Sequence, residues 1–163
     1  MSGIALSRSL RSRLRRFLRD AACASRSSLV IPDGMDGFVH VATAFVRPDG
    51  IYLLETLEGE GRLTAGERLP EWALSGKRRF HFPNPLTALE LKVAAARLIA
   101  GAIPLQGFLV LDDRLELPLA CPPDVVVFAQ LAERLPPLAA DARPLPAYLE
   151  AWARFEAAGQ AAS

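Results

Sequence analysis

The chain has only two cysteines among its 163 residues, Cys23 and Cys121, and this scarcity excludes several classes of protein. Two thiols so far apart form neither a metal knuckle nor a disulfide framework. No apolar run reaches the roughly 18 to 20 uncharged residues of a spanning helix, and the start lacks the apolar core of a secretory signal. We therefore expect a soluble cytoplasmic protein with reduced thiols and no transmembrane segment.

Sequence signatures of several enzyme classes are also missing. The chain contains no phosphate loop and no dinucleotide-binding fingerprint. Its serines and cysteines show no spacing typical of a nucleophile triad. With 51% hydrophobic residues, a chain of this length buries one substantial core, so we predict one domain.

The net charge of +1 hides a strong asymmetry along the chain. Residues 1–30 hold seven arginines and one acid, Asp20, a balance of +6. The remaining 12 basic and 17 acidic residues, obtained by subtraction from 19 and 18, give residues 31–163 a balance of −5. A polyanion is therefore expected to meet the N-terminal segment first.

Apolar residues recur at near-helical spacing through residues 4–22, and arginines fill the other face. We predict that residues 1–24 form a basic amphipathic helix that is part of the fold. Its polar face has three open roles: a solvated surface, a surface for nucleic acid, or a surface for an anionic membrane. The candidate nucleic-acid contacts on this helix are Arg11, Arg15, Arg16 and Arg19.

The main domain is predicted at residues 25–158, with a flexible tail at 159–163. Residues 25–37 are rich in turn formers, and strands are expected at 39–46 and 51–56. The sequence Arg47-Pro48-Asp49-Gly50 between them favours a type I turn, and hence a hairpin. Further elements are a short strand at 62–64, a strand or loop at 78–82, a helix at 86–100, strands at 105–111 and 125–128, a short helix to 135 and a helix at 147–157. This order predicts an α/β fold with a mixed sheet flanked by helices.

An ordered set of short motifs resembles the nuclease-related domain, or NERD, family over residues 38–135. The set comprises Gly50-Ile51-Tyr52-Leu53-Leu54-Glu55-Thr56, Gly61, Trp72, Asn84-Pro85 and Gly107-Phe108-Leu109-Val110-Leu111. The resemblance implies a restriction-endonuclease-like fold, in which an acid on one hairpin strand and a Glu-x-Lys on the next bind Mg²⁺ or Mn²⁺ and cleave phosphodiesters.

Only part of that catalytic set is present. Glu55 matches the family's glutamate, but Leu57 stands at the lysine position and Ala42 at the metal-binding aspartate position. No acid lies among residues 4–19 to match the first-helix glutamate, and the glutamine expected after Asn-Pro falls near Ala88. The resemblance therefore implies a nuclease scaffold whose catalytic function has lapsed.

Nearby groups offer replacements for the missing residues. His40, which strand alternation places on the same face as Ala42, forms with Glu55 a poor metal-binding pair. Asp36, Glu58 and Glu60 lie in flanking turns, and Lys92 or Arg97 on the following helix is a candidate for a displaced cation. A second basic cluster, Lys77, Arg78 and Arg79, is interleaved with aromatic residues that can stack on bases.

We interpret the chain as a NERD-like module that binds nucleic acid or a protein partner and needs no cofactor. The first alternative is an active nuclease that uses Mg²⁺ or Mn²⁺ in a rearranged site. The second is a membrane-surface or scaffold module that acts through its basic helix.

Overall fold

The computed structural model describes residues 9–118 and 120–161. Its elements are α2 (Leu10–Ala21), β1 (Ala24–Pro32), β2 (Phe38–Arg47), β3 (Gly50–Leu57), β4 (Gly61–Thr64), β5 (Glu71–Ser75), β6 (Arg79–Pro83), α3 (Pro85–Ala100), β7 (Leu105–Leu111), β8 (Leu115–Glu116), β9 (Val125–Val127), α4 (Phe128–Arg134), α5 (Pro146–Ala158) and β10 (Gln160–Ala161). The central sheet has the strand order β10-β1-β2-β3-β7-β9. Strands β1, β2 and β3 pair antiparallel in succession, whereas β7 and β9 continue the sheet in parallel. The prediction of an α/β fold with a mixed sheet is confirmed.

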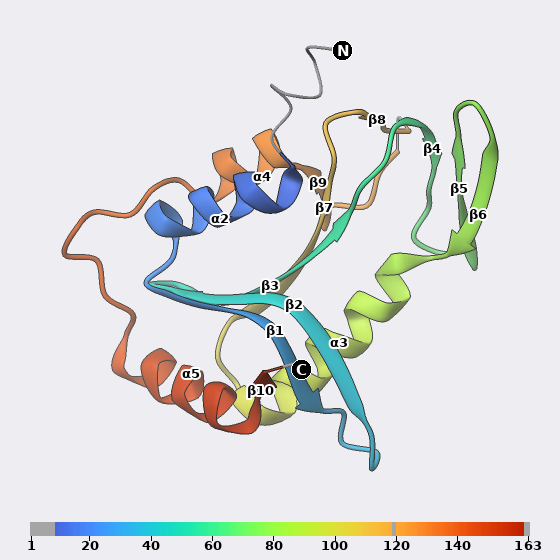
Figure 1. Cartoon of the computed structure of the whole chain (residues 1–163). Coiled ribbons are helices and arrows are strands. Elements are labelled where there is room, and N and C mark those ends of the chain that lie inside the picture. The colour runs from blue at the N-terminus through green and yellow to red at the C-terminus, as the bar shows by residue number, and fades with distance from the viewer. Residues whose placement is uncertain (1–8, 119, 162–163) are drawn as a thin grey trace.

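Helices cover both faces of this sheet (Figure 1). One core lies between the sheet and the pair α3 and α5, and its largest buried side chains include Ile31, Leu53 and Phe155. The opposite core lies beneath α2 and α4 and includes Phe45 and Phe108. Because side chains alternate along a strand, Phe45 and Ala44 on β2 supply opposite cores.

A second, four-stranded sheet in the order β6-β5-β4-β8 lies beyond α3 and the end of β7. Trp72 on β5 is fully buried there beside Leu63 and Leu89, and its indole N–H donates to the Gly66 carbonyl at 2.9 Å. The sequence indicated β4, but it did not predict the strand around Trp72. This sheet is therefore an addition to the single sheet that we expected.

The β2–β3 hairpin forms where the sequence predicted it. Arg47 pairs with Gly50 across the turn, and Gly50 has a φ of 147°. A Cβ atom at this position would lie 2.5 Å from the Pro104 carbonyl oxygen, so only glycine fits without a backbone shift. The turn thereby fixes the register that carries Glu55.

Helix α3 begins as its sequence predicts. The Asn84 side chain accepts a hydrogen bond from the Leu86 amide at 2.9 Å, and Pro85 occupies the first helical position. The amide nitrogen of Asn84 also donates to three carbonyls of the 66–69 loop, the shortest at 2.8 Å from Leu69. One buried side chain thus holds both the helix and the preceding loop.

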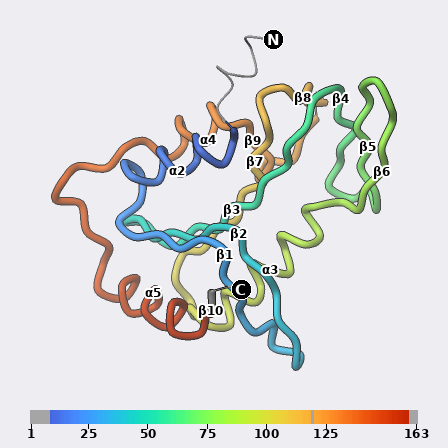
Figure 2. Tube along the Cα trace, in the orientation of Figure 1, coloured from blue at the N-terminus to red at the C-terminus, as the bar shows by residue number. Residues whose placement is uncertain are grey.

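Three expectations for the ends of the domain need correction. Residues 25–32, interpreted as part of a turn-rich segment, belong to β1, because backbone pairing with β2 does not require an apolar side chain at each position. The helix predicted at 1–24 ends at Ala21, Ala24 already belongs to β1, and residues 1–8 lie outside the described residues. Gln160 and Ala161, expected in a flexible tail, pair with Val30 and Leu29 as β10. Figure 2 shows this end of the chain beside β1.

Candidate functional site

Glu55 lies where strands β2 and β3 separate. The backbone pairing between β2 and β3 ends at the Thr43–Leu54 pair. Glu55 is the next residue along β3, just beyond the last pair. Its Oε2 accepts a hydrogen bond from the Ala42 amide at 2.8 Å, and its Oε1 lies 2.8 Å from the Lys92 ammonium on α3. Both charged side chains are mostly buried, with exposed fractions of 17% for Glu55 and 18% for Lys92. The sequence named Lys92 as a candidate displaced cation, and the structure places it against Glu55.

Leu57 follows Glu55 by two residues and packs against the apolar cluster formed by α3 and the second sheet. The position at which the resemblance implies a catalytic lysine is therefore a partly buried leucine that borders the core. Ala42, at the implied aspartate position, contributes its backbone N–H to Glu55 and no charge. The structure thus brings Ala42 and Glu55 together across the hairpin, but supplies one carboxylate instead of two.

These residues do not fit a nuclease metal centre. Mg²⁺ and Mn²⁺ prefer oxygen ligands, and a protein usually offers them one or two carboxylates whose oxygens are free to bind the ion. Here the two oxygens of Glu55 already bind an amide and an ammonium. Among residues 9–118 and 120–161, no group of three His, Cys, Asp or Glu side chains is arranged to hold a metal ion.

His40, the second predicted metal ligand, has a different partner. Its Nε2 lies 3.0 Å from the Ser28 hydroxyl. Ser28 has a φ of 56° within β1, a left-handed conformation uncommon for a residue other than glycine. The hydrogen bonds of Glu55 and His40 therefore join them to separate groups.

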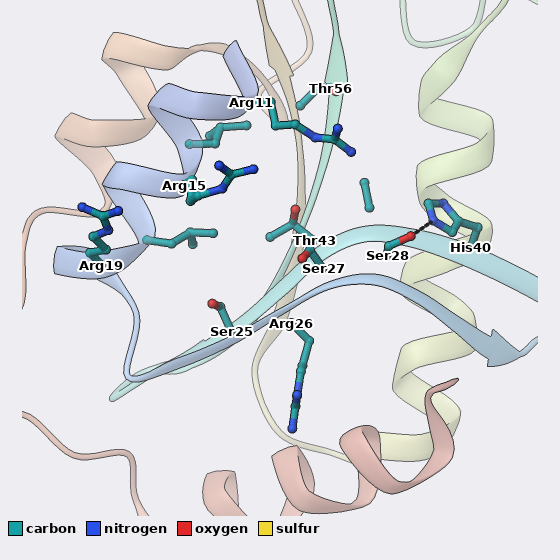
Figure 3. Close-up of a pocket in the computed structure, with 13 residues that line it drawn as sticks. Arg11, Arg15, Arg19, Ser25, Arg26, Ser27, Ser28, His40, Thr43 and Thr56 are labelled. Atoms are coloured by element: carbon teal, nitrogen blue, oxygen red, sulfur yellow. Dashed lines mark hydrogen bonds between the residues drawn. The ribbon is translucent and has the colours of Figure 1, made fainter. Parts of the chain in front are cut away.

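A pocket of about 640 Å³ lies between α2 and strands β1 and β2. One wall consists of α2 residues, with Arg11, Arg15 and Arg19 spaced four residues apart. The other wall is made by the sheet and carries the hydroxyl groups of Ser25, Ser27, Ser28, Thr43 and Thr56. Figure 3 shows Arg11 and Arg15 extending from α2 toward the space above Thr43.

The pocket has a strongly positive lining. Among the described residues that line it are four arginines and no aspartate or glutamate. The fourth, Arg26, is neutralised by Glu156, with 2.6 Å between Nε and Oε2. No ion pair joins Arg11, Arg15 or Arg19 to another residue of the described chain. Arg11, Arg15 and Arg19 therefore line the pocket without a salt bridge to the described chain, and Figure 3 shows Arg11 and Arg15, but not Arg19, extending into it.

The remaining predicted basic residues lie elsewhere. Arg16 is exposed on α2 but does not line the pocket. Lys77, Arg78 and Arg79 are exposed at the β5–β6 turn. This hairpin and α2 lie on opposite sides of β3 and β7 in Figure 1, so the two predicted basic clusters do not form one surface.

Sequence reasoning missed the residue that anchors α2. Arg47 is 6% exposed, and its Nη1 donates to the carbonyls of Ala21 at 2.7 Å and Pro136 at 3.1 Å. It thereby ties the C-terminal end of α2 to the loop after α4. An arginine beside a predicted turn gave no signal of this role.

The apolar face of α2 packs against the rest of the domain. Leu10 and Leu14 are buried against Phe45 and Leu131, and Phe17 contacts the rings of Phe45 and Phe128 edge-on. An amphipathic helix lying on a bilayer inserts this kind of face into the lipid, and here it is already covered. Of the helices in the described ranges, none has the length and apolar content required to span a bilayer.

Comparisons with protein families, with curated proteins and with solved structures gave no match to this chain.

Proposed function

We propose that this chain is a NERD-like domain with a restriction-endonuclease-like fold that binds nucleic acid and no longer cleaves it. The observation that carries the proposal is the row of Arg11, Arg15 and Arg19 along a pocket whose described lining contains no acid. Guanidinium groups bind phosphate oxygens in a bidentate manner, and hydroxyl groups on the facing wall add further donors. The body of the domain is net negative, so phosphates are drawn to this side of the molecule.

The arrangement around Glu55 supports the loss of cleavage. A metal-dependent nuclease holds its cation between carboxylates and so neutralises the charge that develops on the phosphate. In this chain the cation beside Glu55 is the Lys92 ammonium, held by an ion pair that also links β3 to α3. The Glu55–Lys92 ion pair therefore stabilises the hairpin against α3, and a bound metal ion that could activate water has no free carboxylate here.

One observation favours a second candidate, an active nuclease with a rearranged site. Lys92 places a positive charge within hydrogen-bonding distance of Glu55, although it comes from a different element than the lysine implied by the resemblance. In that case cleavage would require Mg²⁺ or Mn²⁺ and would depend on Glu55. A strand-cleavage assay in Mg²⁺ or Mn²⁺ that compares the wild type with Glu55→Ala separates the two candidates.

The proposal is tested by measuring nucleic-acid affinity against salt concentration. Arg11 and Arg15 are replaced by glutamine together, and the matched control replaces Arg62 and Arg68, two exposed arginines elsewhere. Both variants lose two positive charges. We expect the wild type and the control to lose affinity together as salt rises, and the pocket variant to bind at least about tenfold more weakly at low salt. Equal affinity of the two variants would contradict a role for the pocket.

A further inference from the structure

The pocket beneath α2 also limits the form of nucleic acid that can enter, an inference that rests on the proposed function. The space is a cleft between α2 on one side and the sheet on the other, and part of it is open to solvent. Such a cavity admits one chain of nucleotides, whereas a duplex can only lie across its mouth. The donors on the sheet wall, such as Ser27 and Thr43, are then out of reach of duplex phosphates.

The arginine spacing matches an extended polyanion. Residues four apart on an α-helix are separated by about 6 Å along its axis, since each residue rises about 1.5 Å. Arg11, Arg15 and Arg19 therefore present a row of positive charges at regular intervals. A single strand is flexible enough to bring successive phosphates to such a row.

The residues that line the pocket also indicate that the bases of a nucleic acid are not recognised. Sequence-tolerant binders of single strands commonly stack bases on aromatic side chains. None of the described residues lining this pocket is Phe, Tyr or Trp. The aromatic ring on α2, Phe17, instead packs inward against Phe45 and Phe128. The His40 imidazole, which also lines the pocket, lies 3.0 Å from the Ser28 hydroxyl, so the remaining polar groups are arginines and hydroxyls, which suit phosphate and sugar.

We infer that the pocket between α2 and strands β1 and β2 binds the sugar–phosphate backbone of single-stranded nucleic acid without reading its bases. Arg11 and Arg15 contact phosphates, and the hydroxyl groups of Ser27 and Thr43 complete the opposite wall.

The test measures binding of labelled strands of about 12 nucleotides, a length within the range of single-strand sites. The four ligands are a mixed-sequence strand, an oligo-dT strand, a strand with abasic positions throughout, and the matching duplex. We expect the three single strands to bind with similar affinity and the duplex at least about tenfold more weakly. Replacing Arg11 and Arg15 with glutamine should reduce the salt slope for single strands by about 1.4, or 0.7 for each lost phosphate contact.

A second variant tests the effect of the size of the pocket separately from the effect of its charge. Ser27→Leu narrows the pocket at an exposed strand position without changing net charge. We expect it to weaken single-strand binding while its thermal unfolding stays within a few degrees of the wild type. The matched control is Thr64→Leu, which makes the same change in size at an exposed position on β4.

The outcomes distinguish this inference from the proposed function. Equal binding of duplex and single strands, with Ser27→Leu silent and the arginine variant still weakened, would overturn the single-strand inference and leave nucleic-acid binding by α2 intact. Loss of affinity for the abasic strand would overturn the backbone-only mode. Absence of salt-dependent binding to every ligand would overturn both proposals.

Discussion

The ammonium of Lys92 lies 2.8 Å from Oε1 of Glu55, where β2 and β3 part. The carboxylate on β3 thus has a cationic partner supplied by the chain itself. The other oxygen of Glu55 accepts the Ala42 amide, so this one side chain joins β2, β3 and α3. A residue that the resemblance implies for catalysis has a complete structural role here.

Breaking this pair should destabilise the domain. Lys92→Met leaves the mostly buried Glu55 carboxylate without its cation, and we expect the free energy of unfolding to fall by about 1–3 kcal/mol. Denaturant unfolding measures the change. Lys77→Met is the matched control, because Lys77 is exposed and its replacement should change stability by less than about 0.5 kcal/mol.

The double variant Lys92→Met/Glu55→Gln should recover most of that loss. Glutamine keeps an oxygen for the Ala42 amide and removes the unpaired charge. A double-mutant cycle then gives the coupling between the two side chains. Strictly additive effects would show that the pair does not link β3 to α3.

Removing the anchor of α2 should weaken both stability and binding. Arg47→Met removes the donor to the Ala21 and Pro136 carbonyls, and we expect a loss of about 1.5–3 kcal/mol in the free energy of unfolding. Arg62→Met, at an exposed position whose ion pair with Glu116 is 3.5 Å long, is the control. Unchanged nucleic-acid affinity in a folded Arg47→Met protein would mean that the position of α2 does not matter for binding.

Tyr52 provides a pH-dependent test of the hairpin. Burial, together with the hydrogen bond from its hydroxyl to Asp49, raises the pKa of Tyr52 to about 12. The chain has two tyrosines, so in a Tyr148→Phe background absorbance reports Tyr52 alone. We expect its phenol to titrate near pH 12 in the folded protein.

The sign of the stability effect follows from this shift. The contribution of neutral Tyr52 is fully present below the unfolded pKa of about 10 and is lost as pH rises toward the folded value of about 12. Stability should therefore fall less steeply over this range in Tyr52→Phe than in the wild type. Identical slopes would contradict the burial of this phenol.

Some of the fold followed from local sequence rules. Pro48 and Gly50 identified the β2–β3 hairpin, and Asn84 with Pro85 identified the start of α3, because turn and cap residues act through their own backbone conformation. Strand β1 was missed because its first half is polar and its backbone is satisfied by β2. Hydropathy does not report such pairing.

The candidate site was predictable to a similar degree. The arginine face of α2 follows from helical spacing, and the sequence indicates Lys92 as a candidate cation, which the structure places 2.8 Å from Glu55. The pocket itself was not foreseen, because its sheet wall includes Ser25 and Ser27 on the missed strand β1. Tertiary pairing created a site from a segment whose composition predicts turns.

Binding of nucleic acid and cleavage of the same strand can be measured in one sample. A labelled single strand is incubated with the folded wild type or Glu55→Ala in Mn²⁺ or Mg²⁺, and both the bound fraction and the strand length are measured. We predict a bound strand of full length with either protein. A strand shortened by the wild type but not by Glu55→Ala would contradict the account and assign catalysis to a site rebuilt around Glu55 and Lys92.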